Sequence, residues 1–138
     1  MEKKYDINYL GDLRCEALHI KSNTLIETDA PTDNNGKGEK FSPTDLVATA
    51  LVTCILTVVG IHFEQEGRKI SEIKCEVNKV MASNPRRIKE ISIQFDFGSN
   101  SFSHDDLRII EEKVHHCPVT ESLAKDIIIS TNLKQLFY

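Results

Sequence analysis

The sequence predicts an α+β fold, and three observations lead to this prediction. Short segments of alternating hydrophobic and polar residues, separated by turn residues, occupy the N-terminal third and recur later in the chain. A long apolar segment with clear helix signals lies between these two groups, and shorter helical segments follow the second group. Strands that occur in runs, without strict alternation with helices, are typical of α+β domains. The chain has 138 residues and no evident linker, so residues 1–138 are expected to form a single domain.

Composition excludes several classes of protein. Hydrophobic residues make up 40% and charged residues 28%, which is typical of a soluble globular protein with its own core. A net charge of −4 argues against a general nucleic-acid binder. The longest apolar stretch, Leu46–Phe63, is interrupted by threonines, a glycine and a histidine, and the N-terminus lacks the features of a secretory signal. We therefore expect a cytoplasmic protein with no membrane-spanning segment.

The N-terminal third indicates an antiparallel meander. Strands are expected over Tyr5–Leu10, Leu13–Ile20 and Thr24–Thr28, because each alternates in polarity and ends at turn residues. Asp29–Lys40 contains proline, asparagine and glycine and is expected to be a loop.

A long helix begins next. Ser42 suits the N-cap, Pro43 suits the first helical position, and Asp45 completes a capping box with Ser42. The helix is expected to run to Gln65 or Glu66, before the next glycine. Because it is nearly apolar on every side, we expect it to be buried between layers or in a subunit interface.

The rest of the chain adds strands and helices in the order ββ-αα-β. Alternation predicts two strands, around Ile73–Val77 and Ile91–Phe97. A second capping pattern at Ser103–Asp106 begins a helix, and Pro118–Lys125 is expected to form a short third helix. Asp126–Thr131 is expected to be the last strand.

Cys54 lies in the middle of the long helix, where two interpretations stay open. The helix dipole acts within the terminal turns, and burial alone would raise the pKa of the thiol and leave it inert. Cys54 is therefore either a packed core cysteine or a reactive thiol that receives a cation from elsewhere in the fold.

Cys117 precedes Pro118 and so lies at the start of a short helix. Unpaired N–H groups stabilise a thiolate there, and His115 and His116 would add positive charge. The alternative is a partly buried cap residue beside two surface histidines.

The four cysteines are expected to be free thiols, metal ligands or redox groups, because the compartment is expected to be reducing. Cys15 and Cys75 are expected to be small hydrophobic residues of the core. A metal site built from His115, His116 and Cys117, with or without His62, is a further alternative. Adjacent histidines seldom face one ion, so no metal is expected.

Two motifs resemble those of a known family. The first is the helix start Phe41–Cys54, in which the cysteine follows Pro43 by eleven residues, and the second is Cys117–Leu123. With the strand pair around Tyr9–Arg14 and the loop from Asp29 to Gly38, they make nearly the whole chain similar to the OsmC/Ohr family. This family comprises osmotically inducible protein C and the organic hydroperoxide resistance proteins.

The resemblance implies an OsmC-like fold, in which antiparallel sheets wrap around the long helix of an intertwined homodimer. It also implies reduction of organic hydroperoxides in oxidative stress defence, with Cys54 as peroxidatic and Cys117 as resolving cysteine. Arg14 would stabilise the thiolate, although a solvated strand charge is its alternative interpretation. No bound cofactor is implied. The partners would be a small apolar hydroperoxide and an external dithiol of the lipoyl type.

One position departs from the family pattern. The hydroperoxidases carry a glutamate directly after the helix-start proline, where this chain has Thr44. The next residue, Asp45, would lie about 180° around the helix from Cys54, so it is better interpreted as a cap. This departure keeps a second hypothesis open, a non-enzymatic dimer that binds an apolar small molecule or senses redox state. A third hypothesis is a metal-binding regulator.

Overall fold

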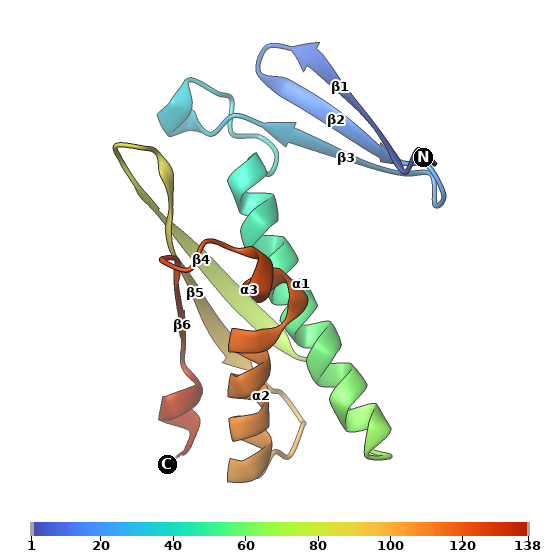
Figure 1. Ribbon diagram of the computed structural model, residues 1–138, viewed down its shortest axis with the longest axis vertical. Helices are drawn as coiled ribbons and strands as arrows, with labels where there is room; N and C mark the ends of the chain where they lie inside the picture. Colours follow the sequence, from blue (N-terminus) through green and yellow to red (C-terminus); the bar gives the residue numbers. More distant parts are fainter. Residues whose placement is uncertain (1, 138) are drawn as a thin grey trace. The chain divides into compact units, whose positions relative to one another are not determined.

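The computed structural model describes residues 2–137, and its strands and helices follow the predicted order βββ-α-ββ-αα-β. Figure 1 follows this order from the N-terminal strands to the C-terminal segment. The chain divides into two compact units, Met1–Val47 and Ala48–Tyr138.

The first unit contains a three-stranded antiparallel sheet. Its strands are β1 (Tyr5–Gly11), β2 (Arg14–His19) and β3 (Thr24–Asp29), paired in that order, which confirms the predicted meander. A short 3₁₀ helix, Thr32–Asn34, lies within the predicted loop. Large hydrophobic side chains stay exposed on this unit, namely Tyr5, Ile7, Tyr9, Leu10, Leu13, Ile20, Leu25, Ile26 and Phe41.

Helix α1 (Pro43–Gln65) begins and ends as its sequence predicts. The Ser42 amide donates to Asp45 Oδ2 at 2.9 Å, and the Asp45 amide donates to Ser42 Oγ at 3.0 Å. This reciprocal pair is a capping box, and it satisfies two backbone N–H groups that the helix itself cannot. At the other end, Gly67 has a φ of 73°, the left-handed conformation that ends helices.

Within the single chain α1 is buried on one face only, so burial of its other face in a subunit interface stays a prediction. One face is buried, through Ala48, Leu51, Val52, Ile55, Val59 and Phe63. The opposite face exposes Ala50, Thr53, Thr57 and Ile61. The two threonine hydroxyls donate to carbonyls one turn earlier, at 2.8 Å each, so the helix itself satisfies them.

Helix α1 is also long and apolar enough to cross a membrane by length and composition, a test that core helices also pass. The sequence expectation that no segment spans a membrane stays a prediction. About a third of its most apolar window is buried inside the protein (33%), and the residues of the buried face belong to the core of the second unit.

The sheet of the second unit has strand order β4-β5-β6. Strands β4 (Lys74–Ala82) and β5 (Arg87–Asp96) are antiparallel, whereas β5 and β6 (Ile128–Thr131) are parallel. The expectation of wholly antiparallel sheets is therefore wrong at β6. Two helices separate β5 from β6 in the chain, and such a crossover returns the chain to the end of the sheet where β5 began.

The core of the second unit lies between this sheet and two helices. Helix α2 (His104–His116) and α1 both appear alongside the sheet in Figure 1. Alternate residues of β5, from Ile91 to Phe95, are buried, as are Leu107, Ile110 and Val114 of α2. Helix α3 (Pro118–Ser122) is shorter than predicted, because Leu123 already has extended backbone angles.

Arg68 joins the segment after α1 to the start of α2. Its guanidinium donates to both carboxylate oxygens of Asp106, at 2.8 and 2.9 Å, and lies 4.7 Å from the centre of the Phe63 ring. Asp106 also forms a capping box with Ser103. The Arg68 bonds, helped by this cap, lower the pKa of Asp106 to about 2.

Candidate functional site

The structure brings the two predicted redox cysteines together. Cys54 lies on α1, and Cys117 lies at the junction of α2 and α3. Although these residues are far apart in the sequence, their side chains interact directly, and both thiols are free. Cys117 is fully buried, whereas Cys54 is partly exposed. Cys54 is therefore the more exposed residue of the two.

The first turn of α3 provides a hydrogen-bond donor to each sulfur. Pro118 begins the helix, and the backbone N–H of Val119 donates to Cys54. The next N–H, of Thr120, donates to Cys117 Sγ at 3.4 Å. N–H groups at the start of a helix have no partner within the helix, so they are available to sulfur atoms that gain negative charge.

The surroundings of Cys54 favour its protonated form. Burial raises the pKa of the Cys54 thiol, and the neighbouring Cys117 acts in the same direction, while the Val119 N–H opposes both. A raised pKa leaves little thiolate near neutral pH. The chemistry of Cys54 as a nucleophile therefore requires a further positive group, as the sequence indicates for a thiol in the middle of a helix.

Arg14 lies on β2 of the first unit and is held by two carboxylates. Its Nε and Nη2 donate to the two oxygens of Asp29 at 2.7 and 2.8 Å, and Nη2 also donates to Glu39 at 3.0 Å. The alternative of a simple solvated strand charge is therefore wrong. Asp29 is buried, and its bond to Arg14 lowers the pKa of the Asp29 carboxyl.

The two other predicted positions, Thr44 and Asp45, lie at the start of α1. Asp45 caps the helix, as expected from its place in the sequence. Thr44 Oγ1 lies 3.2 Å from Ser42 Oγ.

Sequence reasoning missed four groups around these residues. Asp29 and Glu39 accept hydrogen bonds from Arg14. At the start of α3, the backbone N–H of Val119 donates to Cys54 and that of Thr120 donates to Cys117. Two of them had a signal in the sequence. Asp29, the last residue of β3, begins the segment that resembles the family, and Thr120 follows Cys117 by three residues, the spacing of a helix cap.

The remaining cysteines and histidines do not form a metal centre. Cys15 and Cys75 are half-buried, so the expectation of core positions is wrong. Burial nonetheless raises the pKa of Cys75 to about 11. His116 lies 3.3 Å from Glu121, away from any cluster of ligands. Within residues 2–137, no three or more histidine, cysteine or acidic side chains lie together as metal ligands.

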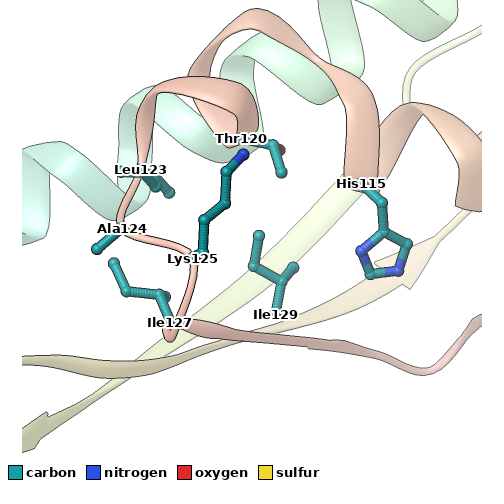
Figure 2. A pocket seen from close by; sticks show the side chains of 7 residues that line it. All are labelled: His115, Thr120, Leu123, Ala124, Lys125, Ile127 and Ile129. Atoms are coloured by element: carbon teal, nitrogen blue, oxygen red, sulfur yellow. The ribbon is translucent and has the colours of Figure 1, made fainter.

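A cavity of about 260 Å³ lies beside Thr120. Figure 2 shows its lining, with Leu123, Ala124, Ile127 and Ile129 as the apolar residues and His115 and Lys125 as the basic ones. Thr120 therefore contacts Cys117 and also lines this cavity. Small-molecule sites usually measure about 300–1,000 Å³, so only a small ligand would fit.

Comparison with known proteins identifies the family. The OsmC-like protein family matches residues 36–132. A candidate osmotic stress induced and detoxification response protein from Psychrobacter arcticus has a solved structure with 41% identity and a TM-score of 0.89, over 95% of both chains. No curated protein matches the chain.

Two more distant structures share the fold. One is the organic hydroperoxide resistance protein OsmC from Legionella pneumophila, with 10% identity and a TM-score of 0.72 over 92% of both chains. The other is a candidate organic hydroperoxide resistance protein from Vibrio cholerae with captopril in one active site. It has 11% identity and a TM-score of 0.70, over 96% of this chain and 93% of the other. The family match and the identity of 41% establish that the chain belongs to the OsmC-like protein family.

Proposed function

We propose that this protein reduces organic hydroperoxides through Cys54 and Cys117. The observation that supports this most strongly is the contact between the two thiols beneath the first turn of α3. A nucleophilic thiol needs access to substrate, whereas a resolving thiol needs access only to the first sulfur. The partly exposed Cys54 and the fully buried Cys117 fit these two roles. Family membership is consistent with them, because the family includes organic hydroperoxide resistance proteins.

The proposed reaction has two steps on the protein. The Cys54 thiolate attacks the terminal peroxide oxygen, so an S–O bond forms, the O–O bond breaks and the alcohol leaves after taking up a proton. Cys117 then attacks the resulting sulfenic acid, and the two sulfurs form a disulfide as water leaves. An external dithiol, which we propose to be of the lipoyl type, reduces this disulfide and is itself oxidised.

Arg14 is the proposed source of the positive charge that Cys54 needs. Its guanidinium keeps a fixed orientation, because Asp29 binds it through two parallel hydrogen bonds. We propose that Asp29 and Glu39 together perform the orienting task of the family glutamate, which Thr44 replaces here. This role for Arg14 stays a prediction drawn from the family resemblance.

A second copy of this chain is the proposed partner. The sheet of the first unit exposes many large hydrophobic side chains, and the open face of α1 adds small and apolar ones. Large exposed apolar surfaces mark interaction sites on proteins. Because both surfaces belong to elements that the family resemblance places in a homodimer, we propose that the dimer covers them. A reducing cytoplasm is the proposed location, since the thiols must be regenerated.

The cavity beside Thr120 favours a second candidate function, the binding of a small molecule without turnover. Its apolar wall and the nearby Lys125 suit a short apolar ligand with an acidic group. Ligand binding is the weaker candidate for two reasons. The cavity is small, and binding alone would not account for the paired thiols of Cys54 and Cys117. Retention of a ligand by protein that consumes no peroxide would support it.

Oxidation with one equivalent of an organic hydroperoxide tests the peroxidase proposal. Wild-type protein is expected to form one disulfide, between Cys54 and Cys117, identified by mass spectrometry of peptides under non-reducing conditions. Cys117→Ser should stop at the sulfenic acid of Cys54, and Cys54→Ser should not react. Cys75→Ser, the same change at a half-buried cysteine outside the site, should behave as wild type. Absence of the disulfide from oxidised wild type would contradict the proposal.

A further inference from the structure

Thr120 links Cys117 to the end of α2 through its hydroxyl group. The hydroxyl donates to the backbone carbonyl of Val114 at 2.7 Å, and Thr120 Oγ1 lies 3.1 Å from Cys117 Sγ. The Thr120 hydroxyl oxygen therefore takes part in two hydrogen bonds. The hydroxyl has one proton, so it can be the donor in only one of them.

The direction of each bond follows from the chemistry of the groups. A carbonyl oxygen only accepts, so the single hydroxyl proton of Thr120 is used on Val114. Thr120 Oγ1 must then accept from Cys117, whose one thiol proton points to Thr120. Cys117 consequently has no proton left for Cys54, and it presents only lone pairs to that sulfur.

We infer that Thr120 is a positioning residue that turns the thiol proton of Cys117 away from Cys54 and aims a sulfur lone pair at it. This inference rests on the proposed peroxidase function and concerns its second step. In that step the S–O bond of the Cys54 sulfenic acid breaks and the S–S bond forms. The Cys54 sulfur is reduced, the Cys117 sulfur is oxidised, and the thiol proton leaves with the hydroxyl as water.

Thr120→Val tests this role, because valine keeps the shape of threonine and removes the hydroxyl. The backbone N–H that donates to Cys117 Sγ remains. Without an acceptor at residue 120, the Cys117 proton is free to turn to Cys54, so disulfide formation should slow. We expect the Cys54 sulfenic acid to last about tenfold longer, the effect of one hydrogen bond. The readout is capture of the sulfenic acid by a 1,3-diketone, together with the rate of disulfide formation.

Two variants serve as comparisons. Thr120→Ser keeps the hydroxyl and should restore the wild-type lifetime of the sulfenic acid. Ser122→Ala removes a hydroxyl from the same helix, one that donates to Pro118, and should leave the lifetime unchanged. A Thr120→Val protein that folds and closes its disulfide at the wild-type rate would overturn the inference. So would a Thr120→Ser protein as slow as Thr120→Val.

An infrared measurement tests the same hydrogen bond without peroxide chemistry. In a background with Cys15→Ala and Cys75→Ala, the S–H band of Cys117 should lie at the lower frequency of a donating thiol. Thr120→Val should move this band, and Thr120→Ser should not. An unmoved band would overturn the inference even if the protein proves to be a peroxidase. A band that moves would support it even if the wild-type protein forms no disulfide, in which case the proposed function alone fails.

Discussion

At the residue scale, the reactivity of the candidate site depends on which atoms donate to each sulfur. Val119 and Thr120 donate through consecutive backbone N–H groups, whereas burial of Cys54 works against its ionisation. The positions of Cys54 and Cys117 could be predicted from their motifs. The part played by Thr120 could not, because the direction of its hydroxyl depends on a carbonyl at the end of α2.

The pH dependence of Cys54 alkylation tests the proposed role of Arg14. Without a cation, burial and Cys117 raise the pKa of Cys54 above its usual value, so thiolate forms only at alkaline pH. In Arg14→Ala the rate of alkylation by iodoacetamide should therefore rise with a midpoint above this value. In wild type the midpoint should lie lower, because a positive charge favours the thiolate. These rates are measured in a background in which serine replaces Cys15 and Cys75, so that Cys117 stays in place.

Arg108→Ala is the matched control for this experiment, since Arg108 is exposed and pairs with Asp105 on α2. It should leave the alkylation midpoint unchanged. Equal midpoints in wild type and Arg14→Ala would contradict the assignment of Arg14 to the Cys54 thiolate.

At the element scale, the residues at which helices begin and end could be predicted closely from the sequence. The burial of a whole helix face could not. Ser42 and Asp45 define the start of α1 by local hydrogen bonds, and local bonds can be predicted from neighbouring residues. The exposed face of α1 depends on which other elements cover the helix. The parallel pairing of β6 is likewise a long-range contact, and the alternation of Asp126–Thr131 carries no information about strand direction.

The contact between Arg68 and Asp106 predicts an acid-dependent loss of stability. The pKa of Asp106 in the folded protein is about 2, below the ordinary 3.8. Its contribution to the free energy of unfolding is therefore fully present above about pH 4. It should be lost as the pH falls from about 4 to about 2. Asp106→Asn should lower the free energy of unfolding at pH 7 by about 2 kcal/mol and remove this loss. Urea unfolding at a series of pH values measures both effects.

Asp105→Asn gives the control, because Asp105 lies next to Asp106 and is exposed. Its free energy of unfolding should stay within about 0.5 kcal/mol of wild type. If Asp106→Asn keeps the wild-type slope between pH 4 and pH 2, another carboxyl causes the acid sensitivity.

At the scale of the whole molecule, the order of the strands and helices could be predicted from the sequence. Which of their surfaces are buried against other parts of the protein or a second chain could not. Alternation, caps and turn residues are local signals, so they gave the order βββ-α-ββ-αα-β. Residues such as Ile7 and Ile26 alternate as a half-buried strand would, yet both are exposed in the single chain. We expect a second copy of the chain to bury these side chains. No pattern within one sequence shows which surface of that copy would do so.

Sedimentation measures the proposed dimer directly. Wild type is expected to sediment as a dimer, and Ile7→Lys should shift it toward monomer, because a charge in an apolar interface is costly. Ile128→Lys makes the same change at an exposed isoleucine of β6, outside the N-terminal sheet, and should stay dimeric. A wild-type monomer at micromolar concentration would exclude the dimer.

Peroxide consumption in the presence of a dithiol tests the central claim most directly. Reduced protein is mixed with cumene hydroperoxide or with hydrogen peroxide, and peroxide loss is followed for wild type, Cys54→Ser and Cys75→Ser. Wild type and Cys75→Ser should consume the organic peroxide rapidly and hydrogen peroxide more slowly, and Cys54→Ser should do neither. Loss no faster than that caused by the dithiol alone would contradict the peroxidase account and leave ligand binding as the function to test.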